Sequence, residues 1–140
     1  MGEVSEVKSL LDTALALGLA GAEHCACLSL DTLAAMYNGV GPARAPGWLR
    51  WLLDKCHRTF LAAVMIHDVD FSESDGTTGG FDLANDRLEY NCLLCADAAY
   101  GAWNPLRYVA RRRARKIAGV CRAVGWTAWM DAFKERTGKR

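Results

Sequence analysis

The sequence predicts an all-α fold. Apolar residues recur at helical spacing along most of the 140-residue chain, and stretches rich in glycine, proline or asparagine separate the helical segments. Two of the segments are long, one from Pro46 to Asp70 and one from Phe81 to Ala99. A connection of about ten residues lets two such helices pack antiparallel, so we expect a single domain, residues 1–140, organised around this pair.

Shorter helices are expected on both sides of the long pair. An amphipathic first helix should end near Gly18 and Gly21, and a short helix follows with Ser29 or Asp31 as its N-cap. A basic helix is expected from about Leu106 to Val124. The last helix is short and aromatic and contains Trp126, Trp129 and Phe133.

Composition and charge are those of an ordinary globular protein. Hydrophobic residues make up 51% of the chain and charged residues 24%, within the range of soluble domains. The net charge is +1, so no overall field selects a partner. No basic segment precedes an apolar run at the N-terminus, and no apolar run is long enough to cross a bilayer. We therefore expect a cytoplasmic location.

The cysteines are expected to be reduced and to fill the core as small hydrophobic residues. A zinc site is disfavoured because its candidate ligands lie inside apolar helical patterns rather than on turns. The six cysteines are Cys25, Cys27, Cys56, Cys92, Cys95 and Cys121.

A histidine interrupts the apolar face of the first long helix. His67 follows Phe60, Ala63 and Val64 on that face, while Asp68 is turned aside by about 100°. Asn85 occupies the inward face of the second long helix. If the helices pack antiparallel, His67 and Asn85 form a hydrogen-bonded pair, which a buried imidazole requires in any case. Taken alone, such a pair is more typical of a core histidine whose ring is satisfied by an amide than of a catalytic one.

A loop upstream of this helix adds possible cation ligands. It reads Tyr37-Asn38-Gly39-Val40-Gly41-Pro42 and can direct several backbone carbonyls toward one point. Together with the Asp68 carboxylate, these oxygens are the ligands that calcium prefers.

This loop, the helix that ends in His67-Asp68 and the helix that carries Ala84-Asn85 together resemble the phospholipase A2 superfamily. The similarity covers roughly Tyr37 to Cys95 and is greatest to its small bacterial and phage-borne branch, which suggests a phage or prophage gene. It implies a phospholipase A2-like helical fold and hydrolysis of the sn-2 ester of glycerophospholipids. His67 would be the general base, and calcium would be held by Asp68 and the carbonyls of Asn38, Gly39 and Gly41.

Two departures from the family pattern stand out. The family orients its histidine with an aspartate, whereas the matching inward position here is Asn85; a shift of one residue would make Asp86 the partner instead. Helical periodicity favours Asn85. The cysteine pairs that brace the secreted enzymes are also missing around His67, so packing must replace them.

Two other functions remain open. A degenerate phospholipase-like domain would bind lipid or a protein without catalysis, in keeping with Asn85. An HD-type metal phosphohydrolase would use the same His67-Asp68 pair, with His24 or His57 as first ligand and Asp97 or Asp131 as last.

The basic helix, together with the tryptophans, suggests a membrane partner. Indole rings favour the headgroup region and basic side chains bind anionic lipid. We therefore expect contact with a phospholipid surface through the Arg107–Arg122 segment and exposed tryptophans. No nucleic-acid partner is expected, because no recognisable module is present.

Overall fold

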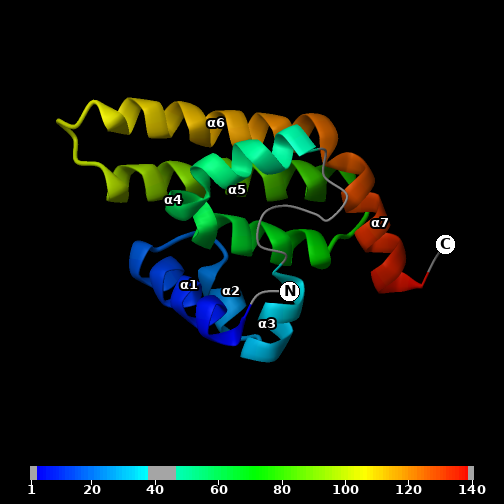
Figure 1. Cartoon of the computed structure of the whole chain (residues 1–140). Helices are drawn as coiled ribbons and strands as arrows, with labels where there is room; N and C mark the ends of the chain where they lie inside the picture. Colours follow the sequence, from blue (N-terminus) through cyan, green and yellow to red (C-terminus); the bar gives the residue numbers. More distant parts are fainter. Residues whose placement is uncertain (1–2, 38–46, 139–140) are drawn as a thin grey trace.

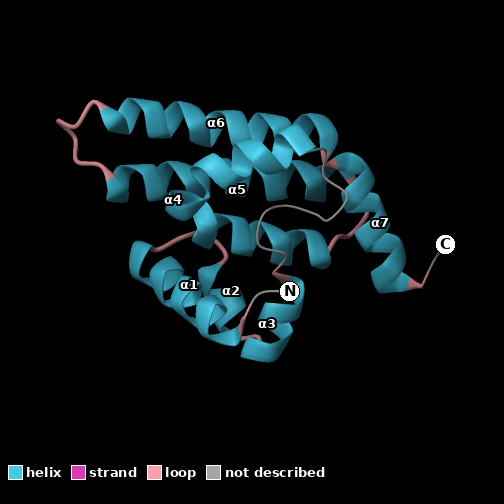
Figure 2. Ribbon diagram, in the orientation of Figure 1, coloured by secondary structure: helices cyan, strands magenta, loops and turns pink. Residues whose placement is uncertain are grey.

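The computed structural model describes residues 3–37 and 47–138, and for residues 47–57 the backbone alone. Within those residues every regular element is a helix, which confirms the all-α prediction (Figures 1 and 2). The elements are α1 (Val4–Leu17), α2 (Ala22–Ala26), α3 (Leu30–Met36), α4 (Gly47–Ser72), α5 (Thr78–Ala99), α6 (Leu106–Val124) and α7 (Trp126–Thr137).

Helices α4 and α5 form an antiparallel pair at the centre of the molecule. Two contacts define their register. The Arg87 guanidinium lies 2.9 Å from the Asp70 carboxylate, and the Cys95 thiol reaches the backbone of Ala63. Residue numbers rise along α5 as they fall along α4, as two helices joined by a short turn require.

The turn between α4 and α5 is shorter than the sequence pattern suggested. Helix α5 begins at Thr78 rather than near Phe81, because the Thr77 hydroxyl accepts a hydrogen bond from the Gly80 backbone N–H and so caps the helix. Gly76 adopts a left-handed φ of 73° within the turn, and the Phe133 ring of α7 packs directly against it. A side chain at this position would meet both the strained backbone and the ring.

Helix α6 lies along α5, on the side away from the N-terminal helices (Figure 1). Its bounds agree with the prediction. Near the start of α6, Arg107 and Arg111 bind the Asp97 carboxylate of α5 at 2.9 and 2.7 Å. Near its end, Arg122 binds Asp86 at 2.8 Å. The two ion-pair sites hold α6 antiparallel to α5 over its whole length.

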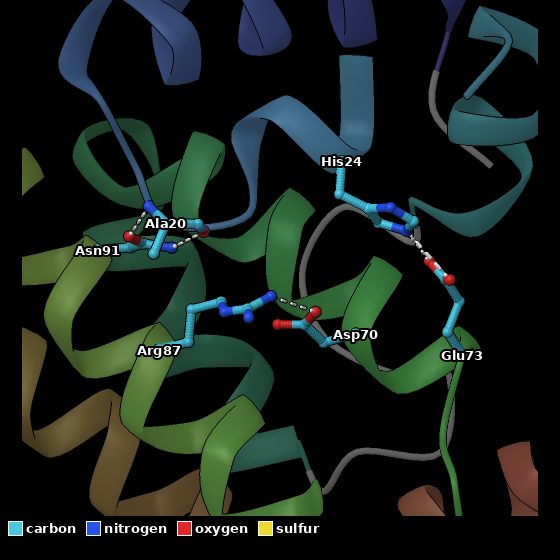
Figure 3. Close-up of polar contacts among 6 residues, drawn as sticks. All are labelled: Ala20, His24, Asp70, Glu73, Arg87 and Asn91. Carbon is cyan, nitrogen blue, oxygen red and sulfur yellow. Dashed lines mark hydrogen bonds and ion pairs between the residues drawn. The ribbon is translucent and has the colours of Figure 1, made fainter. Parts of the chain in front are cut away.

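Helices α1 to α3 cover the opposite side of the α4–α5 pair. The amide of Asn91 makes two hydrogen bonds with the backbone of Ala20, accepting from its N–H at 2.8 Å and donating to its carbonyl at 2.9 Å. The His24 ring of α2 lies 2.6 Å from the Glu73 carboxylate at the end of α4 (Figure 3). Gly18 ends α1 in a left-handed conformation and Ser29 caps α3, both as predicted.

The core contains most of the cysteines whose side chains are described. Cys25, Cys92 and Cys95 are buried and Cys121 is half-buried, as expected of small core residues, whereas Cys27 is exposed. All five are free thiols. The side chain of Cys56 lies outside the described residues. No helix in the described part of the chain combines the length and apolar character needed to cross a bilayer.

Replacing Asn91 by alanine should weaken the attachment of the N-terminal helices. The substitution removes both hydrogen bonds to Ala20 and leaves two partly buried backbone groups without partners. We expect a loss of about 2 kcal/mol in the free energy of unfolding, measured by urea titration. Lys8→Ala, which breaks an exposed pair with Asp12, is the control and should cost under about 0.5 kcal/mol. A smaller loss for Asn91→Ala than for Lys8→Ala would contradict this account.

Candidate functional site

His67 and Asn85 meet across the α4–α5 interface. The His67 Nε2 lies 3.0 Å from the Asn85 Oδ1. His67 is half-buried five residues before the end of α4, and Asn85 is fully buried near the start of α5. The antiparallel packing of the two helices brings these positions together, so the predicted hydrogen bond is present.

The hydrogen bond decides which nitrogen of the imidazole carries a proton. Burial lowers the pKa of His67 from its ordinary value of 6.5 to about 4, and the bond to Asn85 opposes this shift only in part. The ring is therefore neutral at physiological pH. Because an amide oxygen can only accept, Nε2 donates its hydrogen to Asn85 and Nδ1 carries the free lone pair. The free lone pair makes Nδ1 the proton acceptor of the site.

Aromatic packing holds the imidazole ring in place. The centroid of the Phe71 ring lies 4.4 Å from that of His67, and the Trp129 ring packs against Phe71 at 5.1 Å with an edge-to-face geometry. Trp129 is fixed in turn by a hydrogen bond from its Nε1 to the Thr77 carbonyl at 3.1 Å. Helix α7 thus supports the site through two rings. The sequence signal for Phe71 was its i+4 spacing from His67, which places both on one helix face.

The other half of the Asn85 amide lacks a partner. Its Nδ2 is buried and makes no hydrogen bond within the described part of the chain. A buried donor without a partner costs about 1–3 kcal/mol. Among the described residues, Asn85 is thus paired through its side-chain oxygen alone.

Asp86 does not face the imidazole. Its carboxylate binds Arg122 of α6 at 2.8 Å, and its side chain is 68% exposed. One residue along α5 corresponds to about 100° of rotation, enough to move a side chain from the α4 interface to the surface. The alternative pairing of His67 with Asp86 is therefore wrong, and Asn85 is the partner.

Asp68 is more buried than its position beside the apolar face suggested. Only 8% of the residue is exposed, because α4 is covered by α1, α3, α5, α6 and α7 together. Its charge raises the pKa values of Tyr37 and Cys121, so both lie near it, although burial is the larger cause of each shift. Asp68 also has interactions of its own within the chain.

The Asp68 carboxylate lies near Tyr37, the residue that precedes the predicted calcium loop in the sequence. The predicted ligands Asn38, Gly39 and Gly41 lie outside the described residues. Among the residues that are described, no group of three or more His, Cys, Asp or Glu side chains could hold a metal ion. Asp68 is the one predicted ligand whose position the structure describes.

The residues named for a phosphohydrolase are spread over the molecule. His24 binds Glu73, and Asp97 binds two arginines at the far end of α5 from Asn85. Asp131 lies on α7 and has interactions of its own. The side chain of His57 is outside the described residues. This arrangement lends the phosphohydrolase alternative no support.

Two polar contacts of α5 were not indicated by the sequence pattern (Figure 3). Arg87 binds Asp70, and Asn91 binds Ala20. Burial raises the pKa of Asp70 to about 6, although the nearby Arg87 opposes the shift. Asn91 was detectable, because it follows Ala84 by seven residues and so lies on the same buried face of α5.

The low pKa of His67 predicts a pH-dependent stability. The unfolded chain takes up the proton first as the pH falls, so this contribution is complete above about pH 6.5 and is lost as the pH falls toward 4. Between about pH 7 and about pH 4.5, wild type should lose about 2 kcal/mol more unfolding free energy than His67→Gln, measured by urea titration. The opposite trend from Asp70 cancels, because both proteins carry it. Identical pH profiles for wild type and His67→Gln would contradict the prediction.

Comparisons with known proteins give no relative for this chain. No protein-family model, no curated protein and no solved structure matches it. Its function must therefore be argued from the geometry of the site.

Proposed function

We propose that the protein is a phospholipase A2-like hydrolase that cleaves the sn-2 ester of glycerophospholipids. The observation that carries the proposal is the hydrogen bond from His67 Nε2 to Asn85, which leaves the Nδ1 of a neutral imidazole free to accept a proton. The order of loop, His67-Asp68 helix and Asn85 helix supports it, through the resemblance to the phospholipase A2 superfamily described above.

In this proposal His67 activates a water molecule. Nδ1 removes a proton as the water oxygen attacks the ester carbonyl carbon, and the imidazolium then returns that proton to the departing glycerol oxygen. Asn85 holds the ring and fixes its tautomer, while Phe71 limits its rotation. The reaction needs no covalent intermediate with the protein.

Calcium is the proposed cofactor. Asp68 would hold it together with the carbonyls of Asn38, Gly39 and Gly41. When bound, it would supply positive charge to the ester carbonyl as negative charge develops there.

A second candidate is a lipid-binding domain with little or no catalytic activity. The pKa of about 4 makes His67 a weak base at neutral pH. Asn85, unlike an aspartate, cannot neutralise the imidazolium that forms during the reaction. Both observations favour slow turnover. The activity of wild type should therefore be compared with that of Asn85→Asp, a variant in which His67 is a stronger base.

Removing the base should abolish hydrolysis. We expect His67→Gln to lower the release of sn-2 fatty acid from phosphatidylglycerol vesicles by about 10²-fold or more, the usual contribution of a general base. EDTA should stop wild type, and added calcium should restore it.

His24→Gln serves as the matched control, because it replaces an exposed histidine that binds Glu73. It should retain full activity. If wild type releases no fatty acid yet still binds vesicles, the non-catalytic candidate replaces the hydrolase.

Asn85→Asp should make the enzyme faster. A carboxylate at this position removes the buried amide donor that lacks a partner and raises the pKa of His67 toward neutrality. We expect turnover to rise about tenfold and the acidic limb of the pH–rate profile to move upward from about pH 4. Activity of the double variant Asn85→Asp/His67→Gln should be lost. An unchanged acidic limb would show that position 85 does not act through the imidazole.

A further inference from the structure

The turn between α5 and α6 and the first turn of α6 expose large apolar side chains. Trp103 is 98% exposed, and Leu106, Tyr108 and Val109 are 54%, 75% and 44% exposed. The turn projects at the left end of the molecule in Figures 1 and 2, beyond the helices that pack around α4. Apolar side chains that are gathered and exposed in this way mark a site of contact with another surface.

Basic side chains follow the exposed apolar ones along the outer face of α6. Helix α6 contains no acidic residue. Tyr108, Arg112 and Lys116 follow one another at four-residue intervals and form one stripe, opposite the buried face that contains Ala110, Ala114 and Ile117.

The basic residues of α6 are divided between two tasks. Arg107, Arg111 and Arg122 are held in ion pairs with acidic residues of α5, so they serve the fold. Arg112, Arg113, Arg115 and Lys116 are exposed and form no ion pair with any described residue. Their charge is therefore available to a partner.

We infer that Trp103, Leu106, Tyr108, Val109, Arg112 and Lys116, here called the hairpin surface, bind an anionic phospholipid membrane. Exposed tryptophan and tyrosine favour the headgroup region. Leucine and valine enter the acyl boundary, and arginine and lysine bind lipid phosphates. A nucleic acid would use the cations but would leave Leu106 and Val109 exposed without a role, so the mixture of side chains favours a membrane.

The apolar part of the hairpin surface, residues 103–109, is remote from the candidate site. Asn85 lies near the start of α5, and fourteen residues separate it from Ala99 at the end of the helix, about 21 Å along the axis. Binding there would tether the protein and leave His67 free. The inference deepens the proposed function by naming how the protein reaches its substrate, but membrane binding itself does not require hydrolysis.

The test is co-sedimentation of the full-length protein with phosphatidylcholine vesicles, with and without phosphatidylglycerol. We expect binding that needs the anionic lipid and weakens with salt. Arg112→Glu/Lys116→Glu and Trp103→Ser/Leu106→Ser should each weaken it about tenfold. Lys134→Glu and Leu83→Ser are the controls, since they alter an exposed cation of α7 and an exposed leucine of α5.

The possible outcomes separate this inference from the proposed hydrolysis. Equal binding to neutral vesicles, or variants that bind as well as wild type, would overturn it. Binding to duplex DNA or RNA that depends on Arg112 and Lys116 but not on Trp103 would replace the membrane by a nucleic acid. His67→Gln should bind vesicles normally, and the hairpin variants should hydrolyse a dispersed short-chain phospholipid as fast as wild type. If hydrolysis fails but vesicle binding is observed, the inference that the hairpin surface binds a membrane is unaffected.

Discussion

The antiparallel packing of α4 on α5 is the constraint on which the rest of the structure depends. It brings polar side chains of the two helices together inside an apolar interface. A polar group buried there without a hydrogen-bond or ion-pair partner lowers the stability of the fold, because it has lost its contacts with water. Asp70 finds Arg87 and His67 finds Asn85. The flanking helices stabilise the pair from both sides, α1 to α3 through Asn91 and α6 through ion pairs at both of its ends.

Desolvation gives the His67–Asn85 pair its chemical character. Burial keeps the imidazole uncharged, and it also leaves the Asn85 Nδ2 without a partner in the described residues. An aspartate at position 85 would have no amide donor to satisfy. It would also raise the pKa of His67 and so make the imidazole a stronger base. With asparagine at this position the imidazole is a weak base, and this electrostatic setting favours slow turnover in the proposed hydrolysis.

Charge on α6 illustrates how one helix serves two purposes. Residues on the side toward α5 find acidic partners there, whereas those on the opposite side find none among the described residues. A count of basic residues along the sequence treats both sets alike. Seven basic residues lie between Arg107 and Arg122 inclusive. Three of them form ion pairs with α5, which leaves four whose charge can attract an anionic surface.

The sequence by itself determined the helices and the inward direction of His67 and Asn85, because the 3.6-residue period of a helix records which face is apolar. It also favoured Asn85 over Asp86 for the same reason. The expectation that the cysteines fill the core is confirmed for Cys25, Cys92 and Cys95 but is wrong for Cys27, which is exposed. Only the tertiary structure decided that Asp68 is buried, that Phe71 and Trp129 brace the imidazole and that Asn91 anchors the N-terminal helices. These features depend on which elements cover the remaining faces of α4 and α5, and a periodicity within one helix carries no information about its neighbours.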